Sequence, residues 1–289
     1  MVDVLEELVD LLSLEKIEEN LFRGRSQDLG WGTVYGGQVL GQALSAAAQT
    51  VEQDRHVHSL HSYFLRPGDV DRPVVYDVDR IRDGGSFTTR RVVAIQKGRP
   101  IFNMSASFQV TEEGFDHQEE PPEVPDPGEL MTDRERIGRF ADNLPEPLRK
   151  MATAERPIEL RAVDPIEDPV APDERPPNHS HWLKTTGELP DDPALHRYLL
   201  AYAADFSFLT TSLRPHGVTW LTPGMQVASV DHAMWFHRPF RADEWLLHSV
   251  TSPSASGGRG FVRGKVYDAD GMLVASTSQE GLIRNRQSD

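Results

Sequence analysis

The chain has no cysteine among its 289 residues. This absence excludes disulfide bonds, thiolate metal sites and a cysteine nucleophile, and it fits a reducing compartment. The sequence also lacks a Gly-x-Ser-x-Gly motif, a P-loop and a Gly-x-Gly-x-x-Gly loop. Any hydrolysis by this protein therefore proceeds without the acyl-serine intermediate that a nucleophile elbow supports.

Long apolar runs and an excess of basic residues are missing as well. No run approaches the ~20 residues that a membrane helix needs. The N-terminal segment carries Asp3, Glu6, Glu7 and Asp10 where a signal peptide would be basic, so we expect a cytoplasmic protein with no membrane span. The formal net charge of −15 disfavours nucleic acid as a partner, because nucleic acid is itself a polyanion.

The composition that remains is globular, with 38% hydrophobic residues. The length predicts about two domains, and a change in composition indicates where they divide. Residues 119–127 are acidic and proline-rich, which is typical of an extended linker. We therefore expect an N-terminal domain over residues 1–115, a linker with a helical stretch over 116–153, and a C-terminal domain over 154–289.

Both domains are expected to combine a helix with several strands. Apolar residues at helical spacing predict helices, the second of them Ala-rich and buried, over residues 3–12, 39–51, 133–153 and 193–208. β-Branched and aromatic residues between turn signals predict strands over 58–65, 74–80, 86–95, 101–110, 158–163, 181–185, 224–237, 245–251, 260–267 and 272–283. A buried helix followed by an antiparallel meander indicates the α+β class.

The two domains repeat one another in sequence. The segment Tyr63–Pro67 (YFLRP) resembles Trp235–Pro239 (WFHRP), and Phe102–Gln109 resembles Leu273–Gln279 at a similar offset. We interpret this as an internal duplication. Each copy is expected to be one long helix wrapped by a curved antiparallel sheet.

Asp205 is the first candidate for catalysis. It lies late in the helix predicted over 193–208, beside Tyr202 and Leu209. A carboxylate beside an apolar helix face is partly desolvated, which raises its pKa and its basicity. The pattern alone also fits a solvated or helix-capping aspartate.

Two further polar residues are candidates only in combination with Asp205. Gln279 lies in the last predicted strand, and Ser229 lies in the strand predicted over 224–237. Period-two alternation in that strand predicts one common face for Val227, Ser229, Asp231, Ala233, Trp235 and His237. A hydroxyl and an amide can hold a water molecule, whereas each alone is typical of an ordinary strand.

Histidines and arginines suggest other kinds of site. Two pairs, His56 with His58 and His179 with His181, each place two imidazoles on one strand face. No further ligands lie close to either pair in sequence, so we expect neither a metal nor a cofactor. The repeated sheet segments hold guanidinium groups that suit either phosphate binding or surface ion pairs, namely Arg66, Arg82, Arg90, Arg91, Arg238, Arg259 and Arg263.

Longer segments resemble a known family. Residues Val57–Asp69 and Val230–Phe240, the latter followed by Gly260–Gly264, are similar to signatures of the type II acyl-CoA thioesterases (TesB-like). The resemblance extends from Leu21 to Arg286 apart from the linker. It implies a double hotdog fold, self-association into a dimer or tetramer, and hydrolysis of acyl-CoA to a free acid and coenzyme A.

The resemblance also implies roles for the three polar candidates. The family's catalytic aspartate ends a Tyr-x-Ser-Asp motif, which corresponds to Tyr202–Asp205. Its catalytic threonine or serine precedes an aliphatic-Asp-His string and corresponds to Ser229, and its glutamine in the last strand corresponds to Gln279. The chain departs from the family pattern at Ala204, where serine is common, and at Ser229, where some members have threonine.

We therefore expect an acyl-CoA thioesterase in which Asp205, Ser229 and Gln279 hold and activate a water molecule. Candidate substrate-binding residues are His58, Gly37, Arg66, Arg238, Arg259 and Arg263. The alternatives are a catalytically silent acyl-CoA binding protein and a hotdog enoyl-CoA hydratase. Asp243 and His248 share the Asp–His spacing of such hydratases, but the segment lacks their Asn-Pro and reads as a strand, so we interpret the spacing as coincidence.

Overall fold

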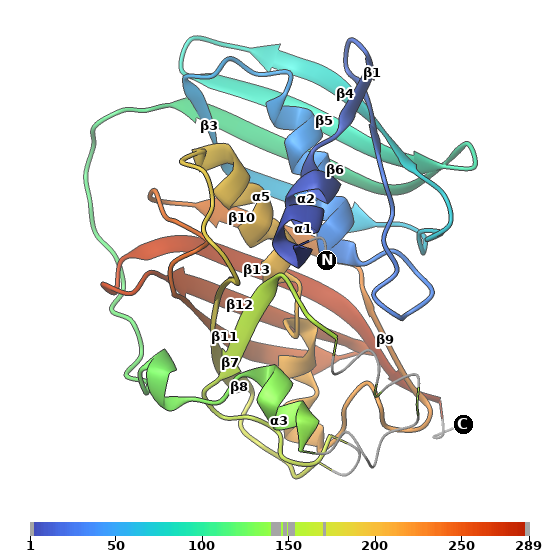
Figure 1. The fold of residues 1–289 in the computed structure, drawn as a ribbon, viewed down its shortest axis with the longest axis vertical. Helices are drawn as coiled ribbons and strands as arrows, with labels where there is room; N and C mark the ends of the chain where they lie inside the picture. Colours follow the sequence, from blue (N-terminus) through green and yellow to red (C-terminus); the bar gives the residue numbers. More distant parts are fainter. Residues whose placement is uncertain (1–2, 140–145, 147–148, 150–153, 170–171, 287–289) are drawn as a thin grey trace.

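The computed structural model describes residues 3–139, 146, 149, 154–169 and 172–286 (Figure 1). The elements of the first half are α1 (Val4–Leu12), β1 (Glu15–Glu18), β2 (Leu21–Gly24), α2 (Gly36–Ala48), β3 (Arg55–Phe64), β4 (Val74–Asp83), β5 (Phe87–Gln96) and β6 (Arg99–Val110). The linker carries the 3-10 turn η1 (Pro127–Glu129) and helix α3 (Asp133–Gly138). Those of the second half are β7 (Ile158–Ala162), β8 (Asn178–Thr185), α5 (Pro193–Ala204), η3 (Leu209–Ser212), η4 (Arg214–His216), β9 (Met225–Ser229), β10 (Asp231–Phe236), β11 (Leu246–Ser256), β12 (Arg259–Tyr267) and β13 (Leu273–Asn285).

The strands of both halves join into one antiparallel sheet. Their order is β1-β2-β4-β5-β6-β3-β10-β13-β12-β11-β8-β7, and β9 pairs with β13 beside this path. Strands β3 and β10 join the halves, with Leu60 opposite Met234 and Tyr63 opposite Asp231. The α+β class is confirmed: helix α2 packs against β4, β5 and β6 of the first half, and η3 packs against β11, β12 and β13 of the second half.

Helices α2 and α5 pack closely in the middle of the molecule. A β-carbon at Gly37 would lie 2.3 Å from the Tyr202 carbonyl oxygen, and one at Gly41 would lie 3.1 Å from that of Tyr198. Glycine at these two positions therefore allows the backbones to approach. Every residue of α2 from Gly37 to Ala47 is buried, as the Ala-rich pattern predicts.

The linker runs along the outside of the molecule from β6 to the second half (Figure 1). It is held there by hydrogen bonds, since the Trp182 indole donates to the Pro125 carbonyl at 3.0 Å and Gln118 donates to the Gly271 carbonyl at 2.8 Å. Helix α3 begins at Asp133 as predicted, but most of the remainder of the helix predicted up to Thr153 lies outside the described residues.

The strand predicted over 224–237 is interrupted by a β-bulge. Ser229 lies opposite Gly281 of β13, whereas Ala233 lies opposite Ser278. The segment from β9 to β10 therefore contains one more residue than the part of β13 with which it pairs. Beyond the bulge the inward side chains are His232, Met234 and Phe236. The alternation predicted from Ser229 to His237 is therefore wrong beyond Ser229, because a bulge reverses which residues face the core.

The first half has an irregularity at the matching place. In β3 the register with β6 shifts between Val57 and Ser59. When the repeats are aligned with Phe64 on Phe236, Val57 coincides with Ser229 and Leu60 with His232.

The sequence patterns do not predict strands β1 and β2, because a strand of four residues is too short to show a recognisable alternation.

Within the described part of the chain, no helix has both the length and the apolar character to cross a lipid bilayer.

Candidate active site

Asp205 directly follows helix α5 and is its C-cap residue. Its backbone N–H donates to the Ala203 carbonyl, and the chain leaves the helix through Phe206 and Ser207. The helix thus ends at Ala204, four residues before the predicted boundary at 208. The residue as a whole remains partly exposed, but its carboxylate is surrounded by protein.

The three polar residues singled out in the sequence converge on one point. The Gln279 side-chain nitrogen Nε2 donates to Asp205 Oδ1 at 3.1 Å and to Ser229 Oγ at 2.5 Å. Gln279 comes from β13, Ser229 from the end of β9 and Asp205 from the end of α5. Residues separated by up to 74 positions therefore form one hydrogen-bonded cluster.

The N-terminus of α2 completes this cluster from the other half of the chain. Tyr35, at the N-cap position of α2, supplies no side-chain hydrogen bond to the first turn. Instead the Gly37 N–H donates to the Asp205 carboxylate, so Asp205 caps a helix to which it does not belong. A β-carbon at Gly36 would lie 2.7 Å from Asp205 Oδ2, which shows how closely the two helix ends approach.

Burial makes Asp205 a stronger base. Desolvation raises its pKa from 3.8 to about 6, while hydrogen bonds from Gln279, Gly37 and Ser229 oppose that rise. Such a carboxylate is mostly ionised at neutral pH, yet it holds a proton far more readily than an exposed aspartate. The cluster therefore has the properties of a general base with two polar groups beside it.

A group of aromatic rings lies beside the cluster. Tyr35 stacks on Phe206 with ring centres 4.5 Å apart and meets Tyr202 edge-on at 5.1 Å. The Tyr35 hydroxyl donates to the Tyr202 carbonyl at 3.0 Å. Trp31, which is 45% exposed, meets Tyr35 edge-on with ring centres 5.6 Å apart. An apolar aromatic wall thus leads from the surface to the residue that follows Asp205.

Gly37 is the one candidate substrate-binding residue that the structure brings into contact with Asp205. In the described structure, Arg259 and Arg263 lie on the outer face of β12, whereas Val262 faces inward opposite Gln279. Arg259 pairs there with Glu280 at 2.9 Å. These two guanidinium groups therefore point away from the cluster.

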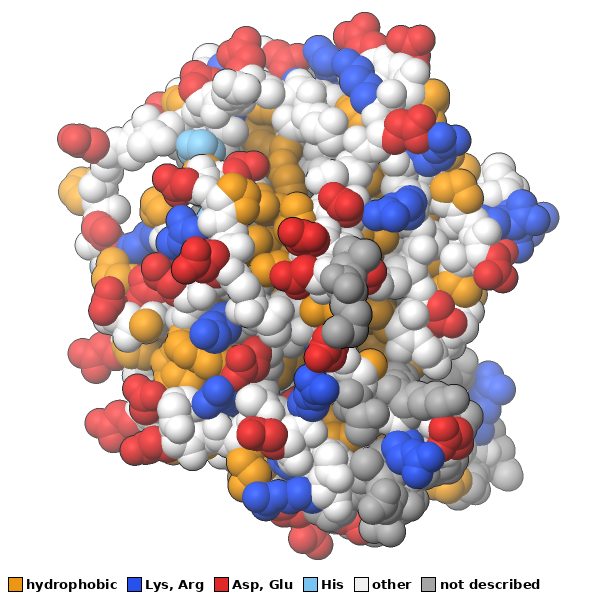
Figure 2. Space-filling model, in the orientation of Figure 1, with side chains coloured by type: hydrophobic (Ala, Val, Ile, Leu, Met, Phe, Trp, Pro, Cys, Tyr) orange, Lys and Arg blue, Asp and Glu red, His pale blue; other side chains and the backbone are white. Residues whose placement is uncertain are grey.

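The other candidates also have local partners. Arg66 donates to the Pro100 carbonyl at 2.7 Å, and Arg238 forms an ion pair with Asp116 of the linker. His58 lies on β3 with its Nε2 2.8 Å from Ser107 Oγ. On the face in Figure 2 basic side chains are scattered among acidic ones rather than gathered.

The other residue patterns noted in the sequence form hydrogen bonds and ring contacts within the fold. Asp243 accepts from Arg241 and from the Leu189 N–H, whereas His248 meets Thr277 at 3.1 Å, so Asp243 and His248 have different partners. His179 lies 2.9 Å from Asp164 and stacks on His181. Among the described residues no three histidine, aspartate or glutamate side chains are close enough together to hold a metal ion.

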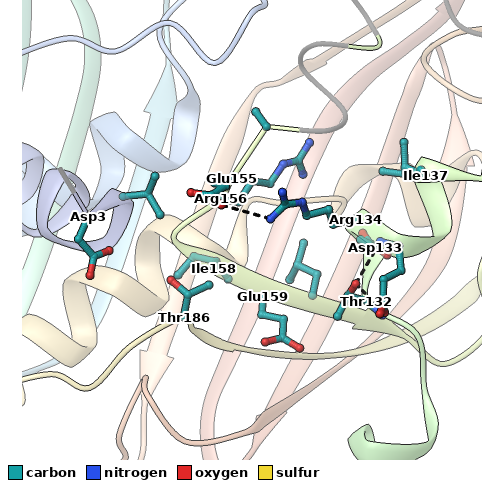
Figure 3. Close-up of a pocket in the computed structure, with 15 residues that line it drawn as sticks. Asp3, Thr132, Asp133, Arg134, Ile137, Glu155, Arg156, Ile158, Glu159 and Thr186 are labelled. Carbon is teal, nitrogen blue, oxygen red and sulfur yellow. Dashed lines mark hydrogen bonds and ion pairs between the residues drawn. The ribbon is translucent and has the colours of Figure 1, made fainter. Parts of the chain in front are cut away.

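A separate hollow of about 830 Å³ lies between α1, α3 and β7 (Figure 3). It is lined by residues of both charges, including the ion pair of Arg134 with Glu155 at 3.6 Å. None of Asp205, Ser229 and Gln279 lines it. We therefore place the candidate active site at the cluster rather than at this hollow.

Comparison with known proteins defines the class of this molecule. A structure with a hotdog fold from Alicyclobacillus acidocaldarius matches with a TM-score of 0.76 at 20% identity, covering 96% of this chain and 98% of that one, which shows the fold. An acyl-CoA thioesterase II, TesB2, from Mycobacterium marinum matches with a TM-score of 0.79 at 40% identity, covering 98% of this chain and 100% of that one. The fold is therefore the double hotdog of thioester hydrolases, as predicted.

Sequence comparison identifies the family. The acyl-CoA thioesterase family matches residues 149–282, and the family of acyl-CoA thioesterase N-terminal domains matches residues 25–109. Acyl-CoA thioesterase 2 of Haemophilus influenzae is 46% identical over 284 residues, covering 98% of this chain and 99% of that protein. The chain belongs to the type II acyl-CoA thioesterase family, and it is an enzyme that hydrolyses thioesters.

Proposed function

We propose that the protein hydrolyses fatty acyl-CoA with a water molecule activated by Asp205. The observation that carries this proposal is the cluster itself, in which a buried carboxylate with a raised pKa shares Gln279 with Ser229. Asp205 removes a proton from the water, and Ser229 and Gln279 orient it toward the thioester carbonyl. Well-placed general base catalysis contributes about 10²–10⁴-fold to the rate.

The first turn of α2 stabilises the oxyanion that forms on the carbonyl oxygen. Backbone N–H groups at a helix N-terminus carry partial positive charge, and they act without reorganisation during the reaction. Gly36 and Gly37 bring this turn against Asp205. When the tetrahedral intermediate collapses, the carbon–sulfur bond breaks and the coenzyme A thiolate takes the proton held by Asp205.

The aromatic wall of Trp31, Tyr35 and Phe206 suits the apolar acyl chain.

The test of the function is free thiol release from acyl-CoAs of C2 to C18. Release with a preferred chain length supports the proposal. Ligand-dependent thermal stabilisation without thiol release would instead indicate a silent binding protein, and hydration of crotonyl-CoA without thiol release would indicate a hydratase. Self-association and a cytoplasmic location are part of the proposal, and sedimentation of the purified protein tests the former.

The pH dependence follows from the raised pKa of Asp205. Because the ionised carboxylate is the base, kcat/KM should rise about tenfold per pH unit below pH 6 and level off above it. The measurement is thiol release between pH 4.5 and 8, with unfolding monitored at each pH. An inflection near 4 would show that Asp205 titrates as an ordinary aspartate and would contradict the proposed environment.

Replacement of Ser229 tests its hydroxyl. Ser229→Ala should lower kcat by about 10–100-fold, because the water loses one of the groups that orient it. Ser229→Thr should retain or modestly raise kcat, since the added methyl restricts the side-chain rotamer while the hydroxyl remains. Equal activity of Ser229→Ala and wild type would remove Ser229 from the proposed machinery.

A further inference from the structure

The side-chain amide of Gln279 has a fixed orientation with one end unsatisfied. Its nitrogen donates to Asp205 and to Ser229, and a carboxylate can only accept, so the nitrogen must face Asp205. The carbonyl oxygen Oε1 consequently points the other way. This oxygen is buried and has no hydrogen-bond partner among the described residues. Buried carbonyl oxygens normally accept a hydrogen bond, so we expect a donor close to Gln279 Oε1.

His232 is the buried donor at that place. The register of β10 and β13 pairs Ala233 with Ser278, and its continuation by one residue brings His232 opposite Gln279. The His232 side chain is fully buried, and neither ring nitrogen has a partner with full hydrogen-bond geometry among the described residues. Burial lowers the pKa of His232 to about 4, although a hydrogen bond with Gln279 opposes this shift. At neutral pH the ring is therefore uncharged, with one N–H to donate.

The surroundings of His232 hold its ring in place. Phe208, which is fully buried, packs against the imidazole with ring centres 5.7 Å apart. The His232 backbone carbonyl accepts from the Ser62 hydroxyl at 2.8 Å, which ties β10 to β3 of the first half. The bulge before His232 is what turns this side chain inward on the same side as Ser229.

We infer that His232 is a positioning residue: its ring N–H donates to Gln279 Oε1 and thereby keeps the Gln279 nitrogen on Asp205 and Ser229. This inference rests on the proposed roles of those three residues. His232 does not touch the water or the thioester. It acts by preventing rotation of the Gln279 amide, which would place a carbonyl oxygen against the Asp205 carboxylate.

The test compares variants of the full-length protein in thiol release from an acyl-CoA that the wild type hydrolyses. His232→Phe removes the donor while keeping a ring, and it should lower kcat by about 10–100-fold with KM within about threefold, as expected for displaced catalytic groups. His232→Gln keeps an N–H donor and should stay within about fivefold of the wild-type kcat. If His232→Phe does not fold, His232→Ala replaces it in every comparison.

A double-mutant cycle with Gln279→Ala separates positioning from general stability. In the Gln279→Ala background, His232→Phe should change kcat by less than about twofold, because no amide remains to be positioned. His181→Phe is the matched control, since His181 is also a buried imidazole whose two ring nitrogens have no hydrogen-bond partner among the described residues, but it lies on β8. Its kcat should stay within about threefold of wild type.

Two results would overturn the inference: a wild-type kcat for His232→Phe, or an undiminished effect of that change in the Gln279→Ala background. Asp205→Asn is measured in parallel to keep the two claims apart. If Asp205→Asn remains active, the proposed function fails. If Asp205→Asn is inactive while His232→Phe is fully active, only the role of His232 fails.

Discussion

Replacement of Asp205 by asparagine should lower kcat for thiol release by about 10²–10⁴-fold, because the reaction loses its proposed base while the side-chain shape is retained. The same variant should be more stable than the wild type. Burial raises the pKa of Asp205 from 3.8 to about 6, so folding at neutral pH forces an ionised carboxylate into an unfavourable environment. A neutral amide removes this cost, which is on the order of 1–3 kcal/mol for a shift of this size.

The sign of the stability effect can be checked against pH. A group whose pKa is raised on folding contributes stability that is fully present below pH 3.8 and is lost as the pH rises through 6. The stability advantage of Asp205→Asn over wild type should therefore be small near pH 4, grow up to pH 6 and then level off. Chemical denaturation at several pH values measures it. An inactive variant that is less stable than wild type at pH 8 would contradict this account and indicate a structural aspartate.

Replacement of Gly37 by alanine should be the second most damaging change. The new β-carbon would lie 2.3 Å from the Tyr202 carbonyl oxygen and 2.5 Å from the Tyr35 ring. Both are fixed, because the Tyr35 hydroxyl bonds to that same carbonyl. Helix α2 must therefore move away from α5, which withdraws the Gly37 N–H from Asp205. We expect a loss of about 1–3 kcal/mol of stability and of about 100-fold or more in kcat.

Gly114→Ala is the matched control for this change. Gly114 lies in the exposed segment after β6, and a β-carbon there would meet no atom of the described residues within 4 Å. Its stability should change by less than about 0.5 kcal/mol, and its kcat should not change. Thermal unfolding and thiol release measure both variants. If Gly37→Ala keeps full activity, the contact between the start of α2 and Asp205 is not needed for catalysis.

Much of the fold follows from patterns that are local in sequence. The buried character of α2 can be predicted from its alanines, and most strands from their β-branched and aromatic residues. The duplication predicts that these elements recur. The bulge between β9 and β10 could not be predicted, since one added residue leaves the composition of a strand unchanged and reverses its faces.

The candidate site is also only partly predictable from the sequence. Asp205, Ser229 and Gln279 could be selected because they match motifs of the family, and the structure brings them together. The Gly37 N–H could not be assigned to Asp205, since the contact joins the start of one helix to the end of another, 168 residues away. His232 is part of the aliphatic-Asp-His string that locates Ser229, but only the bulge shows that it faces inward toward Gln279.

Both copies of the duplicated fold contribute to the cluster, since the Gly37 N–H comes from the first copy and the side chains of Asp205, Ser229 and Gln279 from the second. In β3 the positions that match Ser229 and His232 are held by Val57 and Leu60, neither of which can orient water or hold an amide. In the proposed mechanism, the first copy therefore contributes the N-terminus of α2, while the second contributes the base, Asp205. By this proposal each copy alone lacks part of the catalytic site. Covalent fusion keeps the two contributions in a fixed one-to-one ratio, which two separate chains would reach only by association.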